Sequence, residues 1–595
     1  MSAAGRTLLS YKLQLTLQAP WLVQGSEPGL LGMDAVQLRG PDGNRVLPGS
    51  LIQGRLREAW HALRRLGLSA PDPSEWLGPE VDLEANVNGK QDRNPSRRAQ
   101  RARLWIEDLT EDQPRTASGQ FIARVKIDSA AKAADDGALQ FIEQAEAAGS
   151  SICLSGLCRL WANAEEAKDI AAHLAKGLRW HSQLGALRNI GFGELKEVLV
   201  RPEPEPLPAV LDAQVVGRCG LVIRCNQPLA VGNQRVNGNV FRSSDVITGA
   251  TIKGVLATQL INAGKVIPSW FNRLRVSHAL PSATQRRASH MPHHVINKGQ
   301  AFFALAANEL AFQGADALPY ATDWKPATFN EAAKLQGWGA TRHHLRVRTA
   351  IERGRAKDNH LFVYECCVAE ADTAWRAELV LPGATHAEWA ELITCFNSGL
   401  LGPLGKTDAF VSTQLIAQST QVWPDGPVLE PRLKLMLRSD ALLFTAEQAA
   451  AAQTPEALKH LYQSQWQSLV DARLGQTAKV TVCSLHARQR LAGGDYLHRR
   501  FGQATKPYAP FVLTEAGSYF VLEFATLKQA QDMAQHWQQH GLALPSSVVA
   551  RHGEDWQSNP YQPQNGWGEL AINPELPFDT WPQASKPVAV ESEVN

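Results

Sequence analysis

The sequence lacks the features that mark a secreted, membrane-spanning or zinc-stapled protein. Only 8 cysteines occur in 595 residues, and only Cys366 and Cys367 are close together. The absence of any CxxC pair argues against a structural zinc site or a disulfide framework and fits a reducing cytosol. No apolar run reaches the roughly 18 residues that a membrane helix needs, and residues 1–10 have no signal-peptide pattern. We therefore expect a soluble, cytoplasmic protein with no membrane partner.

An excess of one charge is also missing. The 60 Lys and Arg residues nearly balance 58 Asp and Glu residues, and the net charge is +2. A nucleic-acid site must therefore be a local basic patch rather than a property of the whole chain. The apolar fraction of 44% is enough for several packed cores. At about 150 residues per domain, the chain should hold three or four domains.

A glycine-rich turn recurs along the chain. Gly191-Phe192-Gly193 follows a predicted helix over residues 164–182 and precedes a predicted strand over 198–200. Related stretches occupy residues 402–407 and 565–570, the latter with Gly566-Trp567-Gly568. Paired glycines allow positive φ angles and bring backbone N–H groups close to a ligand. The recurrence therefore predicts a repeated binding turn.

Other landmarks recur in the same order, which indicates an internal duplication. The turn Pro48-Gly49-Ser50 before a predicted helix over 52–66, with Ser50 as a candidate N-cap, reappears as Thr248-Gly249-Ala250. Strand-like residues 124–127 and 137–143 correspond to residues 346–349 and 359–365.

These landmarks predict an α+β fold of tandem ferredoxin-like or RNA-recognition-motif-like domains, with inserted arms and glycine-rich loops. We expect a first domain at 1–201 with an inserted arm at about 67–119, and a Pro/Glu linker at 202–214. A second domain should follow at 215–425 and a degenerate third at 426–595, which includes a helical stretch over 446–474.

The ordered motifs resemble the RAMP proteins of type III CRISPR effector complexes. Residues 1–205 resemble the backbone subunit that coats the guide RNA, through the Asp34 loop, Leu47-Pro48-Gly49-Ser50, Arg124-Val125-Lys126-Ile127-Asp128 and Gly191-Phe192-Gly193. Residues 215–595 resemble the type III-D subunit that caps the 5′ repeat-derived end of the guide, through residues 248–254, 279–281, 290–292, 360–365, 438–443 and 565–568. The resemblance implies a fusion of two neighbouring subunits. Its partners would be guide RNA, target RNA, a large polymerase-like subunit, further backbone subunits and a small subunit.

The resemblance also implies metal-dependent endoribonuclease activity on target RNA at Asp34, which lies in the loop after the first predicted strand. A carboxylate there could hold Mg²⁺ or Mn²⁺ near the scissile phosphate or orient the ribose 2′-hydroxyl. The alternative is a turn-forming or capping aspartate. Asp42 fits a plain turn better, and Asp245, directly before the second turn, is given no chemistry.

The expected RNA contacts are basic, polar and glycine-turn residues. They are Ser50, Gln53, Arg55, Arg124, Arg188, Gly191, Phe192, Gly193, Lys253, His290, Arg346, Lys406, Gly566, Trp567 and Gly568. Phe192 and Trp567 could stack on bases or anchor their loops to the sheet. Arg93, Arg97, Arg98, Arg101 and Arg103 in the arm favour a further RNA contact over a solvated face.

Two other functions remain open. His290, His293, His294, His343 and His344 could be metal ligands, or acid/base groups of a metal-independent guide-processing endoribonuclease. With no third ligand placed by spacing, a loop touching phosphate or solvent is favoured for them. The protein could also be a non-catalytic RNA-binding scaffold. Gly405-Lys406-Thr407 does not form a nucleotide P-loop, because it precedes a predicted strand and lacks the upstream glycine at the required spacing.

Overall fold

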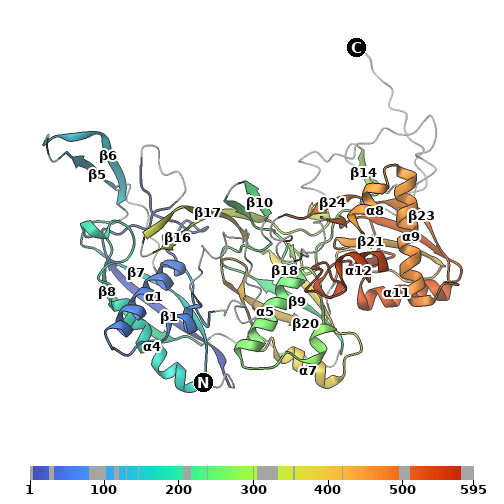
Figure 1. Ribbon diagram of the computed structural model, residues 1–595, viewed down its shortest axis with the longest axis horizontal. Helices are drawn as coiled ribbons and strands as arrows, with labels where there is room; N and C mark the ends of the chain where they lie inside the picture. Colours follow the sequence, from blue (N-terminus) through green and yellow to red (C-terminus); the bar gives the residue numbers. More distant parts are fainter. Residues whose placement is uncertain are drawn as a thin grey trace, which may run out of the picture.

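The computed structural model describes residues 5–577, apart from residues 26–32, 80–101, 113–119, 129, 131, 145, 205–215, 233, 238, 299–300, 305–332, 353–354, 371, 419, 495–496, 498–500 and 502–509. Three modules follow one another along the longest axis of the molecule (Figure 1). Each has two main helices against one face of an antiparallel sheet. The predicted α+β, ferredoxin-like fold class is therefore confirmed.

Module 1 has its first strand at the centre of its sheet. Its elements are β1 (Thr7–Gln18), β2 (Val46–Leu47), α1 (Gly49–Arg65), α2 (Pro73–Leu77), β3 (Leu104–Ile106), β4 (Leu109–Glu111), β5 (Gln120–Ile127), β6 (Ala134–Gln144), β7 (Ser151–Ala162), α4 (Ala164–Arg179), the 3-10 turn η2 (Arg188–Ile190) and β8 (Glu194–Pro202). β1 lies between β7 and β8, and β3 and β4 form a broken second strand on the far side of β7. Leu13, Leu15 and Leu17 of β1 are buried under the helices, as period-two alternation predicts.

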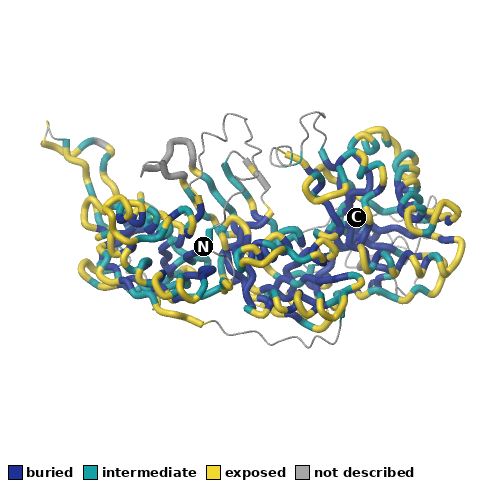
Figure 2. Tube along the Cα trace, turned by 60° about the horizontal axis from the view of Figure 1, so that its bottom comes forward, coloured by how far each residue is buried: buried dark blue, intermediate teal, exposed yellow. Residues whose placement is uncertain are grey.

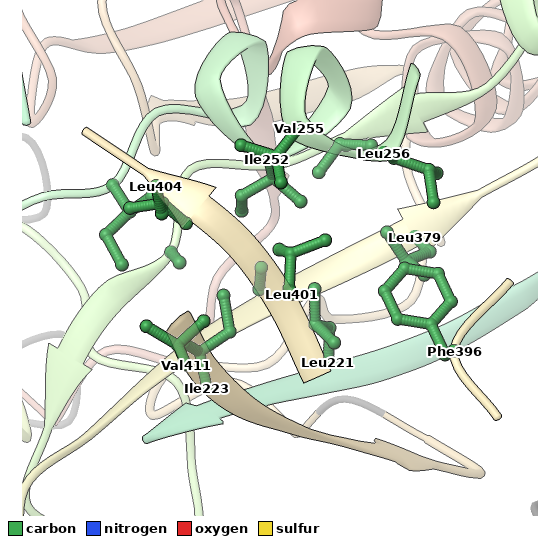
Figure 3. Packing of buried hydrophobic residues seen from close by; sticks show 14 of the residues in the cluster. Leu221, Ile223, Ile252, Val255, Leu256, Leu379, Phe396, Leu401, Leu404 and Val411 are labelled. Carbon is green, nitrogen blue, oxygen red and sulfur yellow. The ribbon is translucent and has the colours of Figure 1, made fainter. Parts of the chain in front are cut away.

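Module 2 repeats this plan. Its elements are β9 (Arg218–Arg224), β10 (Gln234–Asn237), β11 (Val240–Arg242), α5 (Gly249–Asn262), η3 (Ser269–Asn272), β12 (Arg275–Val276), β13 (Leu280–Ser282), β14 (Val295–Lys298), β15 (Ala301–Ala304), β16 (Thr341–Glu352), β17 (Arg355–Ala369), β18 (Ala374–Val380), α7 (His386–Thr394), β19 (Leu400–Leu404) and β20 (Ala409–Ile416). The sheet order is β12-β18-β9-β20-β19, with β9 again central. Figure 3 shows Ile252 and Val255 of α5 above the sheet residues Leu221 and Leu401 in the core of this module.

Module 3 closes the chain with the same order of strands. Its elements are β21 (Arg432–Leu437), β22 (Ala441–Phe444), α8 (Ala446–Ala451), α9 (Pro455–Leu474), β23 (Val480–His486), β24 (Gln489–Ala492), β25 (Phe511–Thr514), β26 (Tyr519–Phe524), α11 (Leu527–His540), α12 (Ser546–His552), η6 (Pro563–Asn565) and β27 (Leu570–Ile572). The sheet order is β23-β26-β21-β27. The helical stretch predicted over 446–474 is divided into α8 and α9, because Thr454 caps a new helix that starts with Pro455.

Modules 1 and 2 carry a long hairpin at the same point of the repeat. β5–β6 and β16–β17 both lie between the second and third strands of their sheets. The β5–β6 hairpin projects from the body of module 1 (Figure 1), whereas buried chain runs through the body of all three modules (Figure 2). No helix in the described part of the chain is long and apolar enough to span a membrane.

The open face of the module 3 sheet is covered by protein. Met436, Tyr519 and Ala571 on that face pack against Val295 and Ala304 of the β14–β15 hairpin. Trp423 and Leu576 complete this small core. An RNA-recognition-motif protein exposes this face to bases, so the described part of module 3 does not offer RNA a free sheet.

Two local expectations are wrong. The stretch predicted as an inserted arm, 67–119, supplies α2, β3 and β4 to the body of module 1. These strands have three residues each, too few for a periodic signal in the sequence. Ser50 is not the N-cap of α1: that place belongs to Pro48, and Ser50 is exposed in the first turn.

Candidate functional site

Asp34 lies in the loop between β1 and α1 and is tied to the second strand of the hairpin. Its Oδ2 accepts a hydrogen bond of 2.7 Å from the Phe141 N–H, and its own N–H donates to the Phe141 carbonyl at 2.8 Å. The residue is exposed. One carboxylate oxygen therefore fixes the loop on β6, and the Asp34 side chain remains accessible to solvent.

The rest of this loop is held by charged side chains. Glu143 of β6 accepts from the Gln37 N–H at 2.8 Å and from Arg39 at 2.5 Å. Arg45, which is 2% exposed, pairs with Glu111 and Glu146 at 2.5 and 2.7 Å. Charge-assisted bonds of this kind are the stronger ones in proteins. The segment that follows Asp34 is thus held in place by ion pairs and hydrogen bonds, which no sequence motif indicated.

The glycine turn of module 1 meets the Asp34 loop in a small core. Phe192 is 4% exposed and packs with Leu22, Ile142 and Ala35, the neighbour of Asp34. The aromatic ring is therefore an anchor for the turn, the second of the two roles considered for it. Gly193 lies buried beside it, while Gly191 is exposed, with nothing within 4 Å of the place that a Cβ would take.

Two predicted arginines come together beside this turn. Arg188 is exposed at the start of η2, and Arg55 projects from α1, where it pairs with Glu58 at 2.8 Å. Partial burial, and then the charge of Arg55, lowers the pKa of Arg188. His181 contacts the Arg55 carbonyl at 2.8 Å and has a pKa lowered by burial. The charge of Arg55 thus acts on Arg188, and Glu58, the partner of Arg55, acts in the opposite direction.

Module 3 contains the same turn, but there it is an interface between modules. Gly191 and Gly566 have φ angles of 92° and 91°, and each donates its N–H three residues back, to Arg188 and Pro563. A Cβ on Gly566 would lie 2.6 Å from His278 Nδ1 and 2.7 Å from the Val276 carbonyl, both in module 2.

Trp567 completes this interface. Its ring meets His278 edge-on at 4.6 Å and Tyr561 at 4.8 Å, and Gly566 and Gly568 are buried. The predicted RNA contact of Gly566, Trp567 and Gly568 is therefore replaced by a protein contact in this structure.

The glycine stretch over 402–407 differs from both of these turns. Residues Gly405 and Lys406 form the turn of the β19–β20 hairpin, and the Lys406 N–H donates to the Ala230 carbonyl at 2.8 Å. The corresponding bond in module 1 runs from Ala186 to Leu22 at 2.7 Å. Lys406 thus matches Ala186, which lies upstream of the glycine pair, and the β19–β20 turn has no counterpart of Gly191-Phe192-Gly193.

Hydrogen bonds also show what module 2 has in place of Asp34. Gln37 Oε1 accepts from the Val23 N–H at 3.1 Å, and Ser243 Oγ accepts from the Val231 N–H at 3.0 Å. Gln37 and Ser243 therefore occupy the same position of the repeat, and the residue three places before each is Asp34 in module 1 and Val240 in module 2. The two segments also pair alike, because Val240 lies parallel to β17 and Ala35 lies parallel to β6. Module 2 therefore lacks the carboxylate at this position.

At both junctions between modules, the residue that caps the first helix of a module also contacts the next module. Asp108 accepts from the first N–H of α1, at Gly49, at 3.0 Å, and His278 accepts from that of α5, at Gly249, at 3.1 Å. Asp108 also forms an ion pair with Arg346 of module 2, just as His278 contacts module 3. The first junction adds Phe410, whose ring lies 5.5 Å from that of Trp105.

Several predicted RNA contacts are thus engaged within the protein. Lys253 is 8% exposed and donates to the Leu274 carbonyl at 2.7 Å, and burial lowers its pKa to about 8. Burial lowers the pKa of Arg346 to about 10. Arg103 is 6% exposed and pairs with Glu75 and Glu166.

The remaining predicted contacts are more accessible or lie elsewhere. Lys406 is exposed. Gln53 on α1 and Arg124 on β5 are half-buried. The arm arginines Arg93, Arg97, Arg98 and Arg101 lie outside the described residues.

The histidines form no recognisable metal centre. His290 packs edge-on against Trp338 at 5.1 Å, and His294 is fully buried against Tyr519. Burial lowers the pKa of His290 and of His293 to about 4. Among the residues described, no group of three or more His, Cys, Asp or Glu side chains could hold a metal ion. Asp34 alone therefore does not make a cation cage, and the RNA and water would have to supply the remaining ligands of a bound ion.

Residues 15–196 match the model of the RAMP superfamily. This segment runs from within β1 into β8, so the match falls on module 1. No curated protein matches the chain.

Three solved structures are also similar in part. A chain of the type III-B Cmr-beta complex bound to cognate target RNA and AMPPnP, state 1, is 11% identical, with 57% of this chain and 93% of that chain covered and a TM-score of 0.30. A chain of the type III-B Cmr-beta complex bound to cognate target RNA is 14% identical over 33% of this chain and 61% of that one, with a TM-score of 0.22. A chain of a type IV-B CRISPR complex is 16% identical over 35% and 96%, with a TM-score of 0.21. TM-scores this low do not establish a shared overall architecture.

Proposed function

We propose that this protein is an RNA-binding subunit of a type III-D-like CRISPR ribonucleoprotein and that module 1 cleaves target RNA at one place. Modules 2 and 3 would cap the 5′ repeat-derived end of the guide, as a capping subunit fused to a backbone subunit. The observation that carries the proposal is the exposed carboxylate of Asp34, held on the hairpin of the module that matches the RAMP superfamily.

The guide would lie along the free turn of module 1. Arg55 and Arg188 supply positive charge there, and Gly191 leaves the backbone bare beside them. A phosphodiester between the two guanidinium groups would relieve their repulsion. In module 2 the exposed Lys406 lies next to Arg348, which donates to the Lys406 carbonyl at 3.0 Å. Lys406 and Arg348 would thus add positive charge in module 2 to that of Arg55 and Arg188 in module 1.

Asp34 suits the transfer of one proton in RNA cleavage. The 2′-oxygen of a ribose attacks the adjacent phosphorus, and its proton passes to the Asp34 carboxylate. The bond from phosphorus to the 5′-oxygen breaks, and that oxygen takes a proton from solvent. The products are a 2′,3′-cyclic phosphate and a 5′-hydroxyl. A divalent cation such as Mg²⁺ or Mn²⁺, bound by Asp34 together with RNA phosphate and water, would stabilise the negative charge of the phosphate.

The alternative is a scaffold in which Asp34 only anchors its loop, because the bond from Phe141 is what an anchoring aspartate would make. Asp34→Asn separates the two functions, since the amide oxygen can still accept from Phe141 while the negative charge is lost. In the assembled complex we expect this variant to bind target RNA and to lose one cut. Asp42→Asn, in the same loop, is the control and should retain every cut. If the Asp34→Asn complex still makes every cut, only the scaffold function remains.

A further inference from the structure

A cavity of about 560 Å³, lined by charged side chains, lies between modules 2 and 3. Its walls come from β9, β12 and β18 of module 2, from the segment joining the modules, and from the end of α11 and the start of β27 in module 3. A volume of this size lies in the range of small-ligand sites. It is distinct from the Asp34 loop and from the turn of module 1, so the proposed cleavage does not involve it.

Arg275 of β12 lines this cavity and is 5% exposed. One guanidinium nitrogen donates to the Trp537 carbonyl at 3.4 Å, near the upper limit for a hydrogen bond. In the described part of the chain no carboxylate lies within ion-pair distance of Arg275. A nearly buried guanidinium with N–H groups left over costs free energy unless an acceptor fills the space in front of it.

The carboxylates around the cavity are already engaged. Glu569 is held by Arg287 through two bonds of 2.7 and 2.9 Å, and Asp425 accepts from Arg438 at 2.9 Å. Burial acts to raise the pKa of Glu569, but the charge of Arg287 lowers it to about 2. This carboxylate is therefore ionised and already paired with Arg287.

Four arginines and four carboxylates line the cavity. Burial lowers the pKa of Arg275, and the charges of Glu569 and Glu378 act to raise it. Both carboxylates have closer partners, Arg287 for Glu569 and Arg218 for Glu378 at 3.5 Å.

Two further polar atoms around the cavity have no hydrogen-bond partner among the residues that the structure describes. They are Nε of Arg438 and Oε1 of Gln421, both buried and both on side chains that line the cavity. The amide of Gln421 can rotate to present its NH₂ group instead. Unsatisfied polar atoms on two side chains therefore lie on residues that line the cavity together with Arg275, and an oxyanion would offer them charge-assisted bonds.

We propose that this cavity binds a phosphate-class oxyanion through Arg275, with Arg438 and Gln421 as further donors. The anion is either a free phosphate compound or the terminal phosphate of an RNA strand, since both present the same oxygens. Binding between the modules would also fix their relative position, because the donors come from both sides of the junction.

The test measures binding of inorganic phosphate and pyrophosphate to the full-length chain by calorimetry, with chloride at equal ionic strength as the blank. Arg275→Gln should weaken binding by about tenfold or more, since charge-assisted bonds are lost. Arg275→Lys should retain part of it. Arg273→Gln is the matched control: Arg273 is a neighbour that pairs with Glu388 outside the cavity, and its loss should leave the affinity unchanged.

Absence of phosphate binding by the native chain, or equal binding by Arg275→Gln, overturns the proposal. If Arg275→Gln does not fold, a density map of the native chain with phosphate decides: an oxyanion within hydrogen-bond distance of Arg275 supports the site, and water alone refutes it. Competition by short RNAs identifies the source. Stronger competition by a 5′-phosphorylated than by a 5′-hydroxyl strand assigns the site to an RNA end, and equal competition assigns it to a free phosphate compound.

Discussion

Replacing Gly566 with alanine should destabilise its module far more than the same change at Gly191. The two glycines have nearly the same φ and the same local hydrogen bonds, so the backbone strain of an alanine is common to both. That strain is about 1 to 2 kcal/mol. A methyl group at Gly191 meets open space, whereas one at Gly566 meets His278 and Val276 at 2.6 and 2.7 Å. Overpacking of this kind adds about 1 to 3 kcal/mol.

Hydrogen exchange measured by mass spectrometry can report each module separately. For Gly191→Ala we expect a small loss of protection confined to the turn of module 1. For Gly566→Ala the loss should be larger and should include both η6 and the start of α5, because these two elements touch across the junction. Equal losses in the two variants, or no change at α5, would refute the assignment of the third turn to the interface.

Three further results are expected. Arg188→Gln should weaken single-stranded RNA binding and reduce the salt slope by about 0.7, the value for one phosphate contact, in filter binding at several salt concentrations. Burial, and then Arg287, lowers the pKa of His278 to about 4 from 6.5. Its stabilising effect is therefore complete above pH 6.5 and falls as the pH drops toward 4, by about 2 kcal/mol at about pH 5, which urea titrations should detect. Arg287→Met should cost about 3 to 5 kcal/mol by leaving Glu569 unpaired, and adding Glu569→Gln should recover much of it in the same titration.

Much of the fold could be predicted because its signals are local. The alternation in residues 8–17 marks β1, and the helical spacing of Leu56, Trp60 and Leu63 marks α1. The turn around Gly191 could be predicted from its paired glycines. The second strand of module 1 could not, because it is divided into two pieces of three residues each, which are too short for any period to appear.

The candidate site was harder to predict, since the role of a residue there depends on distant partners. Gly191 and Gly566 have the same turn, and only His278, far away in the sequence, makes the second one an interface. Lys253 lies on a helix that is buried on several sides, so the sequence does not show that its ammonium turns inward. Asp108 and Arg275 carried no motif at all, because their importance comes from the contact of one module with the next.

In the proposed complex the turn of module 1 lies against RNA, whereas the matching turn of module 3 lies against protein. Photo-crosslinking of the assembled complex, with 4-thiouridine in the guide and mass spectrometry of the peptides, tests this directly. We expect crosslinks within residues 186–196 and none within 562–570. Crosslinks in the second stretch without the first, or a purified complex that carries no nucleic acid, would contradict it.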